Sequence, residues 1–301
     1  MRFYKTLQEK SQYFAKRNIR VDSINDLLAI LKEFDNPYNS EVLFRGQPEA
    51  RFMLYSSLQR IWIDRKLEKH YSSYGELIYN LIDNSRKWNS GLITRYLRNA
   101  GLYESEMSIL SIMQHYGVPT PLLDFTYDIK KSLFFAVNNI DLSPPGIDIE
   151  RYFSIYYFFK NNELLADLPP GKREDTDFGS VMKSDLSLVD NVDEAFRIQN
   201  NLNILNQEGA FIFNSSPKEP LEKQFFTAIS KKKRVSGKEF DSEIGGCINI
   251  SKALAIFILD FLREKKIDNY SMFPDLNQLS RDCLNAEWQK LYAKNDGKAE
   301  R

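Results

Sequence analysis

One stretch of eight residues constrains the fold more than any other part of this chain. Residues 152–159 read Tyr-Phe-Ser-Ile-Tyr-Tyr-Phe-Phe, an almost unbroken run of apolar and aromatic side chains. A strand with one solvent-facing side alternates polar and apolar residues, so this run indicates a strand that is buried on both faces. Such a strand needs a sizeable core. Hydrophobic residues make up 43% of the 301-residue chain, which is enough to form one.

Helices and strands are predicted around this run without a regular alternation. The predicted helices are 24–34, 67–98, 104–115 and 252–266, and the predicted short strands are 41–46, 210–213 and 247–250. Residues 128–138 fit either a short helix or a strand. Because the order of elements has no βαβ rhythm, we expect an α+β fold with helices at the N-terminus and at the periphery.

The same patterns predict how the chain is organised. Residues 41–286 are expected to form one globular unit, which follows an N-terminal helical extension over residues 1–40. Residues 287–301 are expected to be a polar tail. Within the globular unit, residues 160–195 are polar and weakly patterned, which indicates an insertion or a mobile segment.

Composition excludes several classes of function. The 41 basic residues balance the 41 acidic ones, so no global field attracts nucleic acid or acidic lipid, and such binding would need a local patch. The basic cluster 231–234 is either such a patch or a solvated turn. Cys247 and Cys283 are the two cysteines, which excludes a disulfide scaffold and a four-cysteine zinc site. The sequence shows no secretory signal and no apolar run of membrane-spanning length, so we expect a cytoplasmic protein without membrane contact.

The first group of candidate functional residues is Phe44-Arg45-Gly46-Gln47, at the end of a predicted strand. A planar guanidinium there can form paired hydrogen bonds with a diphosphate or a carboxylate. The following glycine lets the backbone approach a ligand closely. The alternative is an arginine paired with an internal carboxylate under a turn.

The second group occupies residues 113–126. His115 lies between a predicted helix end and a Gly-Val-Pro turn, where it can bind a sugar hydroxyl, act as acid or base, or cap the helix. Asp124 and Thr126 follow two leucines, at a predicted strand end, where they can serve a site or cap the next turn. Asp124, Asp128 and Lys130 also resemble the ligand set of a metal-dependent nuclease, although their spacing is tight for that role.

The third group is residues 206–211, in which Gln207 and Glu208 precede a glycine and a short apolar strand. A carboxylate in this position can meet a sugar hydroxyl. The alternative is a loop that simply leads into the strand.

Taken together, these segments resemble the FRG domain family, named for the tripeptide that stands here at residues 44–46. The matching blocks are 44–46, 58–60, 114–126 with 133–136, 206–211 and 273–276, and the resemblance covers about residues 41–285. The block at 114–126, Gln-His-Tyr-Gly-Val-Pro-Thr-Pro-Leu-Leu-Asp-Phe-Thr, is the most specific of them. The family has Gln more often than Glu at position 208, and the carboxylate here favours a catalytic role.

The resemblance implies a mixed or antiparallel β core like that of ADP-ribosyltransferases, with NAD as substrate. It implies that Arg45 holds the NAD phosphates, that His115 or Thr126 meets the nicotinamide ribose, and that Glu208 completes the site. The candidate catalytic residues are Glu208, His115 and Thr126, and the candidate NAD-binding residues are Arg45, Gly46, Gln47, Tyr116, Asp124 and Gln207. No metal is expected.

The expected function is therefore an intracellular toxin or phage-defence effector that transfers ADP-ribose from NAD to RNA or protein, with an antitoxin as a further partner. Two alternatives stay open. One is a non-catalytic module that binds a nucleotide, nucleic acid or protein through the same pocket. The other is the metal-dependent nuclease.

Overall fold

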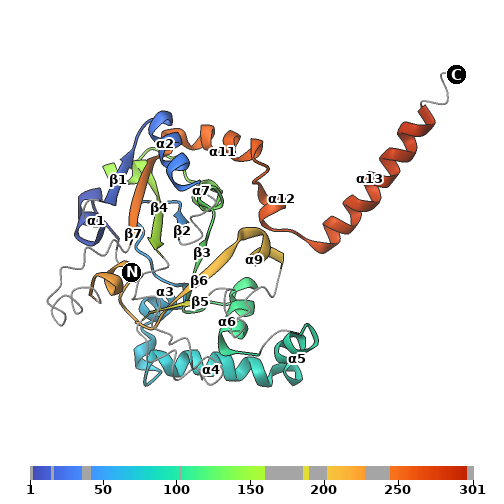
Figure 1. The fold of residues 1–301 in the computed structure, drawn as a ribbon. Coiled ribbons are helices and arrows are strands. Elements are labelled where there is room, and N and C mark those ends of the chain that lie inside the picture. The colour runs from blue at the N-terminus through green and yellow to red at the C-terminus, as the bar shows by residue number, and fades with distance from the viewer. Residues whose placement is uncertain are drawn as a thin grey trace.

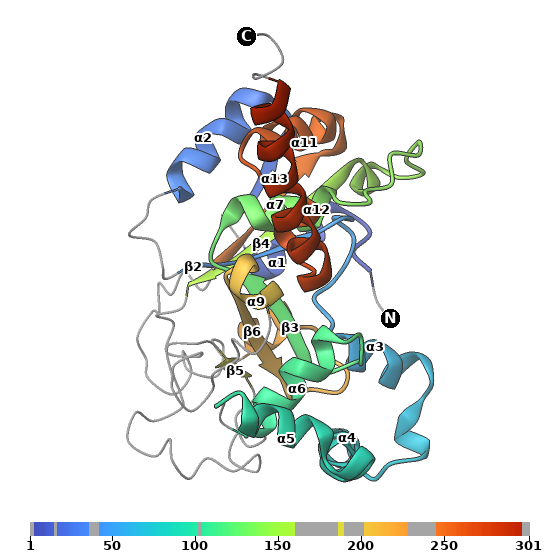
Figure 2. The ribbon, with the colours of Figure 1, turned by 90° about the vertical axis from the view of Figure 1, so that its right-hand side faces the viewer.

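The protein forms a central sheet with helices at both ends of the body, as its computed structural model shows (Figure 1). Residues 3–14, 17–35, 42–101, 104–159, 186–189, 202–227 and 245–296 are described. Helices α2 and α11 lie at one end of the body and α4 and α5 at the other, while α13 projects away from it (Figures 1 and 2).

The strands are β1 (Asn18–Val21), β2 (Val42–Gln47), β3 (Leu122–Thr126), β4 (Tyr152–Phe159), β5 (Leu186–Val189), β6 (Gly209–Asn214) and β7 (Gly245–Ser251). The α-helices are α1 (Leu7–Phe14), α2 (Ile24–Phe34), α3 (Ser57–Asp64), α4 (Tyr74–Lys87), α5 (Leu92–Asn99), α6 (Glu106–His115), α7 (Ile129–Val137), α9 (Leu202–Gln207), α11 (Ala255–Glu264), α12 (Asn269–Met272) and α13 (Leu276–Asp296). Short 3₁₀ turns are η2 (Leu67–Lys69), η3 (Trp88–Ser90), η4 (Asp148–Arg151) and η7 (Lys252–Leu254).

The described strands form one mixed sheet in the order β1-β7-β4-β2-β3-β6-β5. Its pairs are antiparallel except β1 with β7, which run parallel. The predicted α+β class is therefore confirmed. The pairing of strands is shortest near the centre of the sheet, where β2 and β3 share a single register pair, Phe44 with Thr126. By contrast, β2 pairs with β4 over six residues and β3 with β6 over five.

Strand β4 is buried on both faces, as its apolar run predicts. Phe153, Ile155 and Tyr157 pack into a core beneath α2, α7 and α11. Tyr156 and Phe158 pack on the opposite face, against α1 and the helical residues 221–227. The strand lies between β2 and β7, so it has neighbours on every side.

A separate core covers the other half of the sheet. Leu122 of β3 and Phe211 and Phe213 of β6 pack against α3, α4 and α6. Each half of the sheet thus has its own helical layer, and the halves meet where β2 and β3 diverge.

Local signals explain several element boundaries. The Ser23 side chain accepts a hydrogen bond from the Asp26 amide and begins α2, as the sequence predicts. Residues 128–138 form helix α7, which Asp128 caps by accepting from the Lys130 amide. The helix predicted over 67–98 is interrupted, because the chain adopts left-handed backbone near Asn89 and Gly91.

The ends of the chain differ from the prediction in two ways. The N-terminal 40 residues contain the two helices α1 and α2 but also strand β1, which pairs with β7, so this segment is part of the sheet. Helix α13 continues to Asp296, through part of the expected tail. No helix in the described ranges is long and apolar enough to cross a membrane. The segment 160–195, apart from β5, and the basic cluster 231–234 lie outside the described residues.

Candidate functional site

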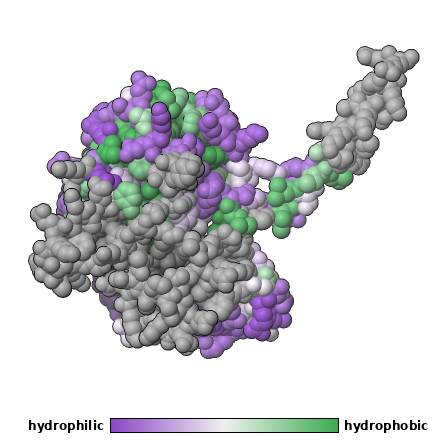
Figure 3. All heavy atoms as spheres, viewed as in Figure 1, coloured by the Kyte–Doolittle hydropathy of each residue, from purple (hydrophilic) through white to green (hydrophobic). Residues whose placement is uncertain are grey.

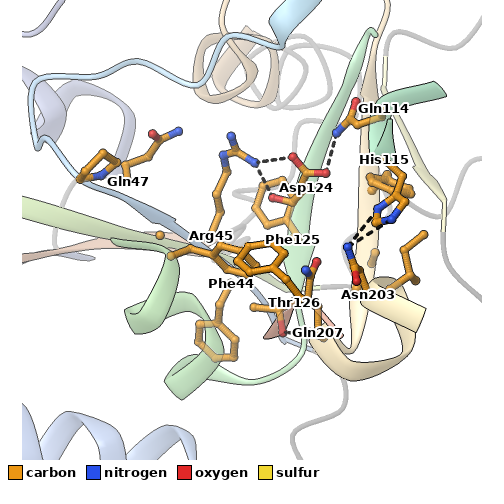
Figure 4. Close-up of a pocket in the computed structure, with 18 residues that line it drawn as sticks. Phe44, Arg45, Gln47, Gln114, His115, Asp124, Phe125, Thr126, Asn203 and Gln207 are labelled. Atoms are coloured by element: carbon orange, nitrogen blue, oxygen red, sulfur yellow. Dashed lines mark hydrogen bonds and ion pairs between the residues drawn. The ribbon is translucent and has the colours of Figure 1, made fainter. Parts of the chain in front are cut away.

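A cavity of about 470 Å³ opens where β2 and β3 separate (Figure 4). Its lining residues are Phe44, Arg45, Gly46, Gln47, Pro48, Gln114, His115, Asp124, Phe125, Thr126, Phe135, Asn203, Ile204, Gln207, Gly209, Ala210, Phe211 and Phe273. These come from both halves of the sheet and from α6, α7 and α9. The three groups singled out in the sequence therefore meet in one cavity of the size that small-molecule sites usually have.

Arg45 provides the positive charge of the cavity. One guanidinium nitrogen, Nη1, donates to the Asp124 carbonyl oxygen at 2.6 Å and lies 3.6 Å from Asp124 Oδ2 (Figure 4). The Arg45 side chain is 17% exposed, and its buried Nε has no hydrogen-bond partner among the described residues. Burial lowers the pKa of the Arg45 guanidinium, against the opposite effect of Asp124, and Arg60 lowers it further. The group nevertheless stays a cation, because arginine does not deprotonate in proteins.

Gly46 serves a different purpose from the one expected. A Cβ on this residue would lie 2.0 Å from the Ser132 carbonyl oxygen and 2.8 Å from the Ala136 amide nitrogen. Glycine is therefore required so that α7 can pack directly on β2. The expected role, in which Gly46 lets the backbone approach a ligand, is not what the close contact with α7 indicates. Gln47 and Arg45 alternate with Gly46 along the strand, and all three line the cavity.

Asp124 connects the two halves of the site. Its carboxylate is 61% exposed and accepts from Gln114 Nε2 at 2.5 Å, in addition to its contacts with Arg45 (Figure 4). Gln114 is itself oriented, because its Oε1 accepts from the buried Thr120 hydroxyl. The carboxylate thus keeps an accessible side while a hydrogen bond from Gln114 and an ion pair with Arg45 fix its position.

His115 lies at the end of α6, as predicted, and faces α9. Its Nε2 lies 3.1 Å from the Asn203 amide nitrogen, which donates to the ring (Figure 4). Burial lowers the pKa of His115 and Asp124 raises it, burial being the larger effect. The ring therefore binds a proton less readily than a free histidine, and its Nε2 lone pair is engaged by Asn203.

Thr126 and Gln207 are tied to each other rather than free in the cavity. The Thr126 hydroxyl donates to the Gln207 carbonyl at 2.6 Å and accepts from the Asp128 amide at 3.1 Å. Gln207 Nε2 donates to the Met272 carbonyl at 2.9 Å. Both residues line the cavity, but these bonds join β3, α9 and α12, so their observed role is to hold the wall together.

Two predicted site residues lie outside the cavity lining. Tyr116 is 79% exposed and borders an apolar hollow between α4, α5 and α6 instead. Glu208 has a positive φ of 48°, and its side chain turns toward α7, where it accepts from Lys131 Nζ at 2.8 Å. The Glu208 side chain is 56% exposed. The turn before Gly209 therefore directs Gln207 into the cavity and Glu208 away from it.

Sequence reasoning missed some of the lining. Asn203 lies in a helix that no motif marked, and only the tertiary structure brings it to His115. Phe273 belongs to a sequence block that resembles the family, but the sequence assigns it no role in a site. The sequence feature that points to Phe273 is an aromatic residue directly before a proline, within the block 273–276.

The described residues contain no group of three His, Cys, Asp or Glu side chains that could hold a metal ion. Within the set that resembled a nuclease, Asp128 caps α7 and Lys130 pairs with Asp35. These two side chains therefore serve the structure of α7 and its surroundings.

Comparison with known proteins identifies one family. The family model named FRG domain matches residues 40–143, which run from β2 through α7 and carry Arg45, His115 and Asp124. No curated protein and no solved structure matches the chain. The matched segment supplies the strand with the Phe-Arg-Gly tripeptide and the signature 114–126, both of which line the cavity. Residues 40–143 of this chain therefore match the FRG domain, in agreement with the resemblance of its motifs.

Proposed function

We propose that this protein is an NAD-dependent ADP-ribosyltransferase whose site is the cavity between β2 and β3. The observation that carries the proposal is Arg45, a cation whose buried Nε has no partner in the described part of the chain, in a cavity that also holds an accessible carboxylate. A guanidinium in this setting suits the diphosphate of a dinucleotide. Aromatic and amide side chains in the same lining suit its rings and hydroxyls.

The proposed reaction needs a carboxylate beside the nicotinamide ribose. The bond from C1′ to the nicotinamide nitrogen breaks, nicotinamide leaves with the bonding electrons, and positive charge develops on the ribose. Within the lining, Asp124 is the carboxylate placed to stabilise that charge. An oxygen or nitrogen of the acceptor then bonds to C1′ and loses its proton. His115, which lines the cavity, is the base that takes the proton in this proposal, once the acceptor group replaces the Asn203 amide at Nε2.

The role of Glu208 changes in this proposal. The family resemblance implies that it is catalytic, but its ion pair with Lys131 turns it away from the cavity. We therefore assign the stabilising carboxylate to Asp124. In this proposal the mixed sheet serves as the core of the transferase. The acceptor is a macromolecule, RNA or protein, as expected for a toxin or defence effector.

The test is NAD turnover by the full chain. Purified protein is incubated with NAD labelled in the adenylate part and with cell lysate, and both nicotinamide release and label transfer are measured. Arg45→Ala should weaken NAD binding by at least about tenfold, because a charged hydrogen bond contributes about 1.5–3 kcal/mol. Asp124→Asn should lower turnover about 100-fold.

Glu208→Gln is the matched control, because it removes a carboxylate of similar exposure from outside the cavity lining. It should keep turnover within about threefold of wild type. Turnover that is lost in Glu208→Gln and kept in Asp124→Asn would return the catalytic role to Glu208. If the wild-type protein neither releases nicotinamide nor transfers the label, the proposed transferase activity is refuted.

The second candidate is a binding module without catalysis. The placement of Glu208 favours it, since the carboxylate implied by the family is engaged with Lys131. This candidate predicts that NAD or another nucleotide raises the melting temperature without any release of nicotinamide. Arg45→Ala would abolish that rise, whereas Asp124→Asn would preserve it.

A further inference from the structure

The cavity has an aromatic wall that the residue roles above do not use. Phe135 of α7 and Phe273, which follows α12, both line it. The Phe273 ring centroid lies 6.1 Å from those of Phe134 and Phe135, at interplanar angles of 53° and 77°. Phe134 is buried, whereas Phe273 is 42% exposed. One side of Phe273 therefore packs on α7 and the rest is open.

The backbone that carries Phe273 is firmly attached to the body. Asn206 Nδ2 donates to the Ser271 carbonyl and Gln207 Nε2 to the Met272 carbonyl, each at 2.9 Å. Met272 is buried in the core beneath α7 and α11. Helix α12 is thus pinned to α9 and to the core, and Phe273 is held in place although its ring is exposed. A fixed, exposed aromatic ring in a concave wall is a feature of ligand sites rather than of ordinary surfaces.

Arg45 and Phe273 lie within reach of one ligand. Arg45 of β2 and the exposed ring of Phe273 both line the cavity of about 470 Å³. A ligand that joins an anionic phosphate to a flat ring matches this pair.

We propose that Phe273 is a ligand-binding residue that stacks on the flat heterocycle of a nucleotide whose phosphate is held by Arg45. Stacking on an aromatic face accepts any planar ring, because it depends on the π surface rather than on hydrogen bonds. The proposal rests on the proposed function for the identity of the nucleotide. NAD offers two such rings, nicotinamide and adenine, and Phe273 serves one of them.

Calorimetric titration of the full chain tests the proposal and tells the two rings apart. The probes are NAD, ADP-ribose, which lacks nicotinamide, and nicotinamide mononucleotide, which lacks adenine. Phe273→Leu keeps an apolar side chain against α7 but has no π face, and Phe273→Tyr keeps the face. Phe273→Leu should bind NAD about tenfold more weakly than wild type, and Phe273→Tyr should bind it within about twofold. If ADP-ribose also binds about tenfold more weakly, the stacked ring is adenine, and if nicotinamide mononucleotide does, it is nicotinamide.

Tyr270→Ala is the matched control. Tyr270 is 46% exposed on α12, the short helix that precedes Phe273. It lies outside the cavity lining, and its hydroxyl donates to Asp282. It should bind NAD as wild type does. If Phe273→Leu binds all three probes as wild type does while Arg45→Ala loses them, the stacking proposal is refuted and the proposed function stands. A wild-type protein that binds none of the probes refutes both.

Discussion

Three consecutive residues of β2 have different structural roles because of the geometry of a strand. Phe44 packs in the core beneath α7, Arg45 turns its guanidinium to Asp124, and Gly46 leaves room for the backbone of α7. Successive side chains on a strand point to opposite faces, so a core residue, a ligand residue and a packing residue can follow one another. The Phe-Arg-Gly tripeptide of the family therefore contributes both to the lining of the cavity and to the packing of β2 against α7.

Gly46→Ala should destabilise the protein more than a glycine-to-alanine substitution at a position where the added methyl group has room. The new Cβ would meet two backbone atoms of α7, which cannot rotate away, so α7 must shift from β2. We expect a loss of about 3 kcal/mol or more in the free energy of unfolding, at the upper end of overpacking effects. Chemical denaturation measures it.

Gly209→Ala is the control for that substitution. At Gly209 the nearest atom to an added Cβ is 3.5 Å away, an ordinary contact. Its unfolding free energy should change by less than about 1 kcal/mol. Equal losses in the two variants would mean that glycine at position 46 is not needed for packing.

His115 gives a second prediction at this scale, concerning pH. Burial lowers its pKa in the folded state, so the unfolded state binds the proton more readily. Stability from this group is therefore present above the ordinary histidine pKa of about 6.5 and is lost as pH falls through the lower folded value. The chain has two histidines, His70 and His115, so two ring signals appear in an NMR titration, and His70→Asn assigns them. The His115 signal should titrate below pH 6.5, and a midpoint above that value would contradict the burial.

At the scale of elements, one buried lysine attaches α1 to the sheet. Lys10 is completely buried, and its Nζ donates to Ser154 Oγ of β4 at 2.8 Å and to Asn249 Oδ1 of β7 at 2.9 Å. Its ammonium also lies 4.9 Å from the Tyr156 ring centre. Burial lowers the pKa of Lys10. The hydrogen bonds compensate for the desolvation, so the lysine fixes where α1 sits.

Lys10→Met should therefore destabilise the fold although methionine fits a similar volume. The substitution leaves the Asn249 and Ser154 side chains with fewer partners in a buried place, at about 1–3 kcal/mol for each group left unsatisfied. Thermal unfolding compares it with Lys5→Met, which changes an exposed lysine on the same segment. Equal melting temperatures for the two variants would show that the Lys10 network contributes nothing to stability.

At the scale of the whole molecule, the body and α13 are nearly independent. Helix α13 projects from the body after α12, and Figure 3 shows apolar residues along the part of this arm nearest the body. Leu276 and Leu284 are exposed there. The last buried residue before this arm is Met272. The fold of the body is therefore complete at α12.

A chain that ends at Pro274 should melt within about 2 °C of the full chain, because little buried surface is lost. A chain that ends at Lys266 is the matched comparison, since it also lacks Met272 and Phe273. Removing the buried Met272 should cost about 2–5 kcal/mol, which lowers the melting temperature by several degrees. A large loss in the longer of the two chains would mean that α13 stabilises the body.

Much of this protein is determined by the sequence itself. The unbroken run at 152–159 predicts a strand buried on both faces, and Ser23 predicts the start of α2, because strand burial patterns and helix caps depend on neighbouring residues. The clustering of Arg45, His115 and Asp124 in one site also follows from their motifs, which resemble those of a single domain family.

The tertiary structure alone decides which way these residues face. Glu208 leaves the cavity through a left-handed turn and an ion pair with Lys131, 77 residues away in the chain. The Thr126 hydroxyl is engaged by the Gln207 carbonyl, and Asn203 reaches His115 across 88 residues. Such contacts depend on register and packing between distant elements. Local residue patterns hold no information about register and packing between distant elements. The family motif therefore locates the site but does not determine the orientation of each side chain within it.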